Sequence, residues 1–66
     1  MNIELRFLEK AAKDGNYISF SYENQHLKKV KPLKLTFKEE HYYLHTPDAI
    51  FKFEHIKNIQ ISKEKF

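Results

Sequence analysis

The fold of this chain depends most on residues 28–37, which read Lys-Lys-Val-Lys-Pro-Leu-Lys-Leu-Thr-Phe. After Pro32 the apolar residues recur at every second position, which is the spacing of a strand with one buried face. Val30 has the opposite parity, so the apolar side of the stretch changes across Pro32. Because proline has no N–H to donate to a strand ladder, we expect a bulge or sharp bend at Pro32.

The sequence before this stretch predicts one helix and one strand. Residues 3–13 carry apolar side chains at helical spacing, and Gly15 stands where a left-handed C-terminal cap is expected. Asn2 is a suitable N-terminal cap. Residues 17–23 alternate apolar and polar side chains as a strand does, and a turn at 23–25 leads into the strand at 28–37.

The sequence after this stretch predicts three more short strands, at 41–46, 49–54 and 57–62. Lys38-Glu39-Glu40 and Thr46-Pro47-Asp48 provide the polar turns between them. One N-terminal helix followed by about five closely connected strands is typical of an antiparallel meander closed into a small barrel. In a chain of 66 residues we therefore expect a single, mainly β domain over residues 1–66.

The apolar side chains of the strands divide into an expected core and one expected surface residue. Aromatic and branched side chains at strand spacing fill the interior of a small barrel. Tyr42 has the opposite parity to Tyr43, so if Tyr43 points inward, Tyr42 stands on the outer face. There its ring would either stack on a base or cover a neighbouring strand. The expected core residues are Phe20, Tyr22, Leu33, Leu35, Tyr43, Leu44, Phe53 and Ile56.

The composition is that of a folded protein from a reducing compartment. The hydrophobic fraction of 41% is too high for a disordered segment, and no cysteine is present for a disulfide or a thiolate metal site. No apolar run approaches the length of a membrane span, so we expect a cytoplasmic protein without membrane contact. The net charge of +3, with lysine as eleven of the twelve cations, favours anionic partners held by point charges.

The residues that catalysis or metal binding requires are missing or badly spaced. One glycine cannot form a glycine-rich phosphate loop, and Ser19 and Ser21 alternate with apolar residues on a strand. His41 and His45 would lie about 13 Å apart along one strand, too far to share an ion. We therefore expect no enzymatic activity, no metal and no cofactor.

Short motifs along the chain form an ordered set that matches a known family. Residues 18–22 form a strand that ends in an aromatic residue, and residues 28–35 combine basic positions with Val, Pro and Leu. Tyr42-Tyr43-Leu44 is similar to the tripeptide Trp-Tyr-Leu, and residues 51–56 are similar to Phe-Arg-Leu-Asp-Arg-Ile. This order resembles the WYL domain, a small Sm-like or SH3-like barrel of bacterial transcription regulators. Lys52 and His55 stand where the family has two arginines.

The resemblance implies a non-catalytic, ligand-sensing domain that binds a nucleotide or single-stranded nucleic acid and regulates transcription. Such a domain acts through a DNA-binding module supplied in cis or in trans. Lys28, Lys52 and His55 would then neutralise phosphate, and Tyr42 would stack on a base. Lysine keeps the charge of arginine without its bidentate fork, so the affinity or the identity of the ligand can differ from the family's.

Alternatives to this function follow from the same residues. The lysines between residues 28 and 38 also suit an exposed strand whose charges keep its edge from pairing with other chains. The domain would instead serve protein interaction or homo-oligomerisation, with open strand edges and exposed aromatic side chains docking another chain. A third reading is non-specific nucleic-acid binding with no sensing role.

Overall fold

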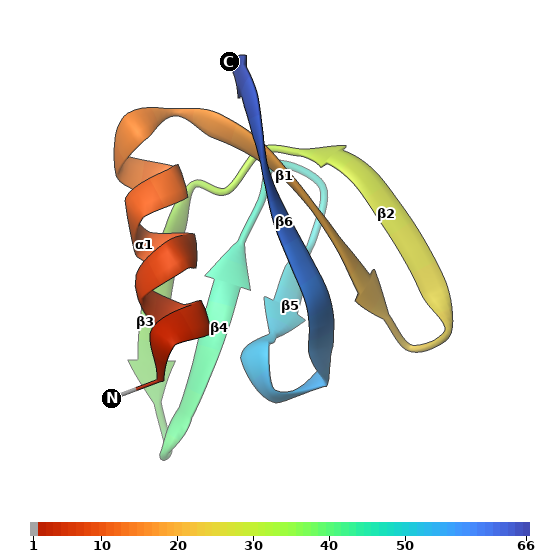
Figure 1. Cartoon of the computed structure of the whole chain (residues 1–66). Coiled ribbons are helices and arrows are strands. Elements are labelled where there is room, and N and C mark those ends of the chain that lie inside the picture. The colour runs from red at the N-terminus through yellow and green to blue at the C-terminus, as the bar shows by residue number, and fades with distance from the viewer. Residues whose placement is uncertain (1) are drawn as a thin grey trace.

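A computed structural model describes residues 2–66 and shows one helix followed by six strands (Figure 1). The helix, α1 (Ile3–Asp14), has both of the caps that the sequence predicts. The Asn2 side chain accepts a hydrogen bond from the N–H of Glu4 at 2.8 Å. Gly15 adopts the left-handed conformation with φ of 73° and donates its N–H to the carbonyl of Ala11.

The strands form two three-stranded antiparallel sheets. In order across the first sheet they are β2 (Gln25–Val30), β1 (Asn16–Tyr22) and β6 (Ile56–Lys65). In order across the second sheet they are β3 (Lys34–Lys38), β4 (His41–His45) and β5 (Ile50–Lys52). A short 3₁₀ turn, η1 (Phe53–His55), connects the two sheets between β5 and β6.

The structure confirms a mainly β domain and corrects two details of the prediction. The expected strand at 28–37 is two strands, β2 and β3, because the chain bends at the buried Pro32. A separate bulge lies at Lys29, which has φ of 54°, where the pairing of β1 with β2 shifts register. The expected closure into a barrel is wrong, because η1 turns the chain away from β5 and β6 pairs with β1 instead.

The core lies between α1 and the facing sides of the two sheets. Leu8 and Ala11 of α1 pack with Ile18, Phe20, Leu44 and Ile56, and each of these side chains is buried. Full burial of a side chain such as Phe20 or Leu44 contributes about 1.5–3 kcal/mol. Three of the expected core residues are therefore confirmed as buried, and Tyr22, Leu35 and Phe53 pack partly buried against them.

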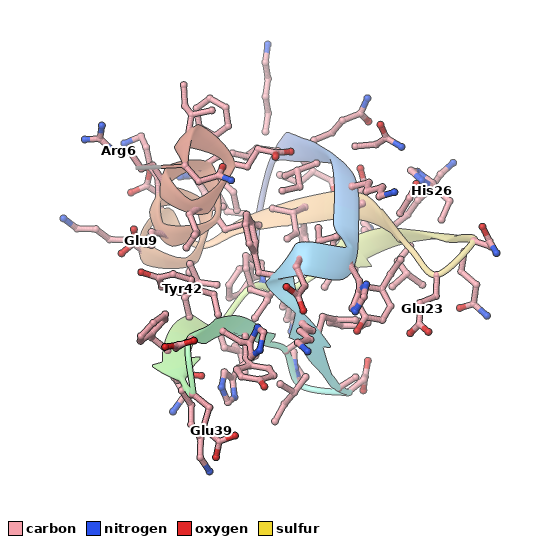
Figure 2. The ribbon with its side chains drawn as sticks, turned by 90° about the horizontal axis from the view of Figure 1, so that it is seen from below. Arg6, Glu9, Glu23, His26, Glu39 and Tyr42 are labelled. Atoms are coloured by element: carbon pink, nitrogen blue, oxygen red, sulfur yellow. The ribbon has the colours of Figure 1, made fainter. Side chains whose placement is uncertain are left out.

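Two of the expected core residues lie elsewhere. Leu33, in the link between β2 and β3, is 49% exposed. Tyr43 is half-buried on the outer side of the second sheet, because β4 has the opposite orientation to the one expected. The buried Leu44 pairs with Leu35, and Tyr42 pairs with Phe37 on that same side, where the two rings lie 4.6 Å apart. Figure 2 shows Tyr42 on the side of the sheet that faces α1.

Tight two-residue turns join the strand pairs at two places. Glu23 and Asn24 connect β1 to β2, and Glu39 and Glu40 connect β3 to β4. All four residues have positive φ, between 47° and 68°. Positive φ at both central residues is the requirement of the type I′ turn, which matches the twist of the flanking strands. The turns hold the register of both hairpins.

Candidate functional site

The second sheet carries a polar face on the side away from α1. Residues directly opposite each other in an antiparallel pair share a face of the sheet. Thr36, Tyr43 and Lys52 form one such row, and the next row begins at Lys34 on β3. This outer face consists of Lys34, Thr36, Lys38, His41, Tyr43, His45, Ile50 and Lys52.

Tyr43 occupies the centre of the outer face. It lies on the middle strand, with His41 and His45 two residues away on the same side and Thr36 and Lys52 on the neighbouring strands. Thr36 Oγ1 and His45 Nε2 are 2.8 Å apart, so a hydrogen bond fixes the imidazole beside the tyrosine. The arrangement places a half-buried ring among hydrogen-bonding groups and cations.

Lys52 is tied to Glu54 of η1. Its Nζ lies 3.0 Å from Oε1 of Glu54, and His41 Nδ1 lies 3.5 Å from the same oxygen. The hydrogen bond with Glu54 raises the pKa of Lys52, and the same bond lowers the pKa of Glu54. The pair is open to water, with side chains 33% and 50% exposed, so another anion can compete for Lys52.

His55 lies close to Lys52, through contacts that both make with Tyr22. The backbone N–H of Lys52 donates to the hydroxyl of Tyr22 at 3.3 Å. The His55 ring meets the Tyr22 ring edge-on, with centroids 6.1 Å apart. Two of the residues expected to bind phosphate, Lys52 and His55, thus both contact Tyr22 at one end of the second sheet.

The other two expected binding residues lie apart from this pair. Tyr42 packs against Phe37 on the inner side of the sheet, 41% exposed, so its ring covers a neighbouring strand. Lys28 lies on β2 in the first sheet, beside a groove of about 570 Å³ between β2 and the turn at Thr46-Pro47-Asp48. The structure therefore does not gather the four expected residues into one pocket.

Sequence reasoning missed the centre of the outer face. Tyr43, Thr36 and His45 gave no signal of their own, because Tyr42-Tyr43-Leu44 are consecutive apolar residues that fit either orientation of the strand. The alternation in the preceding strand did contain this information, because Lys34, Thr36 and Lys38 indicate that one side of that strand faces solvent. Pairing that side with the neighbouring strand brings Thr36 opposite Tyr43.

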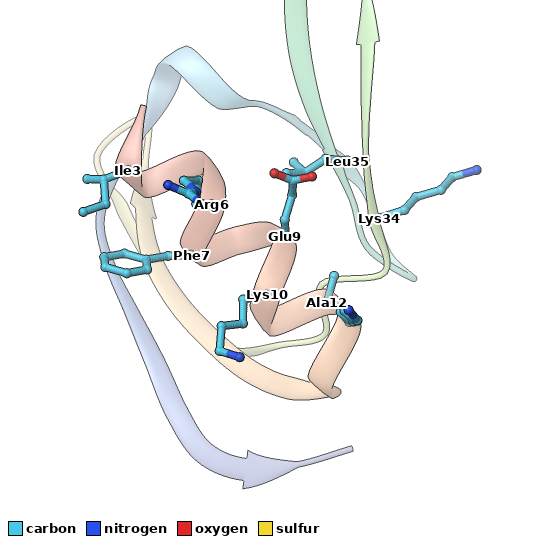
Figure 3. Close-up of a pocket in the computed structure, with 9 residues that line it drawn as sticks. Ile3, Arg6, Phe7, Glu9, Lys10, Ala12, Lys34 and Leu35 are labelled. Carbon is cyan, nitrogen blue, oxygen red and sulfur yellow. The ribbon is translucent and has the colours of Figure 1, made fainter. Parts of the chain in front are cut away.

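A shallow depression of about 780 Å³ runs along α1 and is a weaker candidate (Figure 3). Ile3 and Phe7 lie on one side of the helix and Leu35 lies on the other. The charges along it are mixed, because Glu9 accompanies Arg6 and the lysines. A surface of this kind does not select a ligand of either sign.

Two further features were sought in the described part of the chain, a cluster of metal-ligating side chains and a membrane-crossing helix. Among residues 2–66, no three His, Asp or Glu side chains are grouped so that they would hold a metal ion. No helix within those residues has the length and apolar character to cross a membrane. Comparisons of the chain with family models, with curated proteins and with solved structures find no match.

Proposed function

We propose that this chain is a WYL-like domain that binds single-stranded nucleic acid on the outer face of the second sheet. The position of Tyr43 carries the proposal, because its half-buried ring lies opposite Lys52, with Lys34 and Lys38 in the adjacent rows of the same face. Aromatic rings stack on bases of any sequence, and lysines beside them attract the phosphates. A sheet face with this composition suits a strand whose bases are splayed out.

The strand order supports the resemblance to an Sm-like or SH3-like barrel. β2 and β3 lie in different sheets and are joined by the bend at Pro32, and together they are called the bent strand below. The order is then β6, β1, the bent strand, β4 and β5, with a 3₁₀ turn between the last two strands of the chain. The six strands thus follow one another around an open barrel that has a gap between β5 and β6.

Lysine as the main cation favours recognition of the phosphate backbone and not of particular bases. An ammonium group contacts phosphate as a point charge, whereas base edges are read by bidentate groups such as arginine, asparagine and glutamine. We therefore expect little dependence on base sequence. A role in transcription regulation then requires a DNA-binding module, in cis or in trans, that responds when the outer face is occupied.

An NMR titration tests this proposal. Labelled protein is mixed with short single-stranded DNA and RNA, with a cyclic dinucleotide and with a mononucleotide, and amide shifts are mapped onto the chain. We expect shifts at residues 34–38, 41–45 and 50–55 with the oligonucleotides. The affinity should fall steeply between about 50 mM and about 200 mM salt, because phosphate contacts release counterions. Absence of shifts on the outer face at millimolar oligonucleotide would contradict the proposal.

A further inference from the structure

The outer edge of β2 has no strand partner within residues 2–66. β1 pairs with one side of β2, and β2 forms the margin of the first sheet (Figure 1). An edge strand presents N–H and C=O groups that are free to pair with another extended chain. The edge of β2, interrupted by the bulge at Lys29, can therefore pair with one more short strand.

The hydrogen bonds between the bent strand and β4 end before they reach the edge of β2. The last hydrogen bond between the bent strand and β4 runs from the N–H of Leu33 to the carbonyl of His45, at 2.8 Å. The chain then turns away, because the Thr46 N–H donates to the carbonyl of Ala49 at 2.9 Å and the Thr46 hydroxyl donates to it at 2.7 Å. This turn leaves the position beside β2 to another segment.

The groove beside β2 has an apolar lining. It measures about 570 Å³ and lies between β2 and the Thr46-Pro47-Asp48 turn. Leu27 and Val30 of β2 and Phe51 of β5 line it, and all three are half-buried and pack against the core. Alternate side chains of an added strand would find apolar contacts there, as in other cases of strand addition.

The rim of the groove is strongly basic. Lys28, Lys29, Lys31 and His26 line it, and Asp48 is the one acidic residue that does so within residues 2–66. Lys29 contacts Glu64 at 3.6 Å, in a pair whose two side chains are 70% and 62% exposed. Because an exposed ion pair contributes little free energy, Lys29 can leave Glu64 and contact the carboxylate of a ligand instead.

The unpaired backbone groups of β2 and the basic rim of the groove together indicate which kind of partner binds there. A second copy of this chain pairing through β2 would bring its own lysines against these, and like charges across an interface are strongly disfavoured. Nucleic acid would satisfy the charges and leave the strand edge without a backbone partner. We propose that the groove binds an extended acidic peptide segment, which adds to the first sheet beside β2 and presents carboxylates to Lys28 and Lys31.

This binding site is separate from the outer face of the second sheet. Lys28 and Val30 belong to the first sheet, whereas Tyr43 and Lys52 belong to the second. The proposed peptide binding does not rest on the proposed function. The protein could bind oligonucleotides and still not bind the peptide. The position of the amide shifts distinguishes the two failures.

The test uses a fluorescent octapeptide in which Glu and Val alternate, with both ends blocked. Fluorescence anisotropy measures its affinity, and NMR maps the shifts in the labelled protein. We expect shifts at residues 26–31 and 46–51. The double variant Lys28→Glu, Lys31→Glu should weaken binding about ten-fold or more, because it places like charges at the rim. The charge-matched control Lys13→Glu, Lys63→Glu changes lysines that do not line the groove and should bind as wild type does.

Two further peptides separate strand addition from simple charge attraction. An octapeptide of alternating Lys and Val should not bind, and one with every second amide N-methylated should lose most of the affinity. Equal binding of the methylated peptide would overturn the proposal, as would an absence of shifts along β2 at millimolar peptide. A single-stranded oligonucleotide that shifts the same β2 amides and displaces the acidic peptide would also overturn it, in favour of a nucleic-acid groove. Circular dichroism confirms that each variant is folded.

Discussion

The ammonium group of Lys52 lies 3.0 Å from a carboxylate oxygen of Glu54, at the edge of the outer face. Lys52 is the cation opposite Tyr43 in the strand register, so a phosphate beside a base stacked on Tyr43 would meet it first. Glu54 holds that cation in the free protein and repels the incoming phosphate. If the outer face binds nucleic acid as we propose, this pair controls how readily Lys52 meets the phosphate.

Replacing this carboxylate should strengthen nucleic-acid binding. Glu54→Gln keeps the size of the side chain and removes the negative charge, so Lys52 and His41 become available to phosphate. We expect a tighter dissociation constant for single-stranded oligonucleotides in fluorescence anisotropy, and a steeper dependence on salt because one more phosphate contact forms. Glu64→Gln in β6 makes the same change in the first sheet, where it also frees a lysine, Lys29, and should leave the affinity unchanged. Equal gains from both variants would point to net charge alone.

The same pair predicts how stability depends on pH. The hydrogen bond lowers the pKa of Glu54, so its stabilising effect is present above the ordinary glutamate pKa and is lost as the pH falls through the lowered value. It raises the pKa of Lys52, so that contribution is present below the ordinary lysine pKa and is lost as the pH rises through the raised value. Wild type should melt slightly above Glu54→Gln near neutral pH, and the difference should vanish in acid. A difference that grows on acidification would refute this assignment.

The two neighbouring tyrosines should separate binding from stability. Tyr43→Ala removes the ring at the centre of the outer face and should weaken oligonucleotide binding by about 1–3 kcal/mol if one base stacks on it. Tyr42→Ala removes a ring that packs on Phe37 at 4.6 Å and should lower the melting temperature while leaving the affinity of the folded protein unchanged. Thermal melts and anisotropy titrations on both variants provide the comparison. A Tyr42 variant that loses binding without losing stability would return Tyr42 to the binding role expected from sequence.

These two tyrosines also show which parts of the structure could be predicted from the sequence and which could not. The helix and its caps at Asn2 and Gly15 were predictable because each depends on local backbone chemistry. The orientation of β4 was not, since three apolar residues in succession fit both faces and only the pairing with β3 decides between them. The centre of the candidate site was missed for the same reason.

The bend at Pro32 was predictable and its consequence was not. A proline within a strand marks a break in the ladder, and the structure places the bend there. Whether the sheets close into a barrel depends on the direction that β6 takes after η1. Long-range contacts determine this direction, so the spacing of residues in the sequence does not predict it. The separation of Lys28 from Lys52 follows from the same geometry, because β2 and β5 belong to different sheets.

The turn between β3 and β4 should be a point where stability can be gained. Glu39 and Glu40 have φ of 50° and 68°, a conformation that costs residues with a side chain about 1 kcal/mol each. Asn-Gly is the preferred pair for a turn of this type, so Glu39→Asn, Glu40→Gly should raise the melting temperature by about 4–8 °C for each kcal/mol gained. The same pair placed at Lys63-Glu64, in the extended strand β6, should lower it. Melting curves followed by circular dichroism compare the two variants with the wild type. An unchanged or lower melting temperature for the turn variant would show that the positive φ values carry no strain.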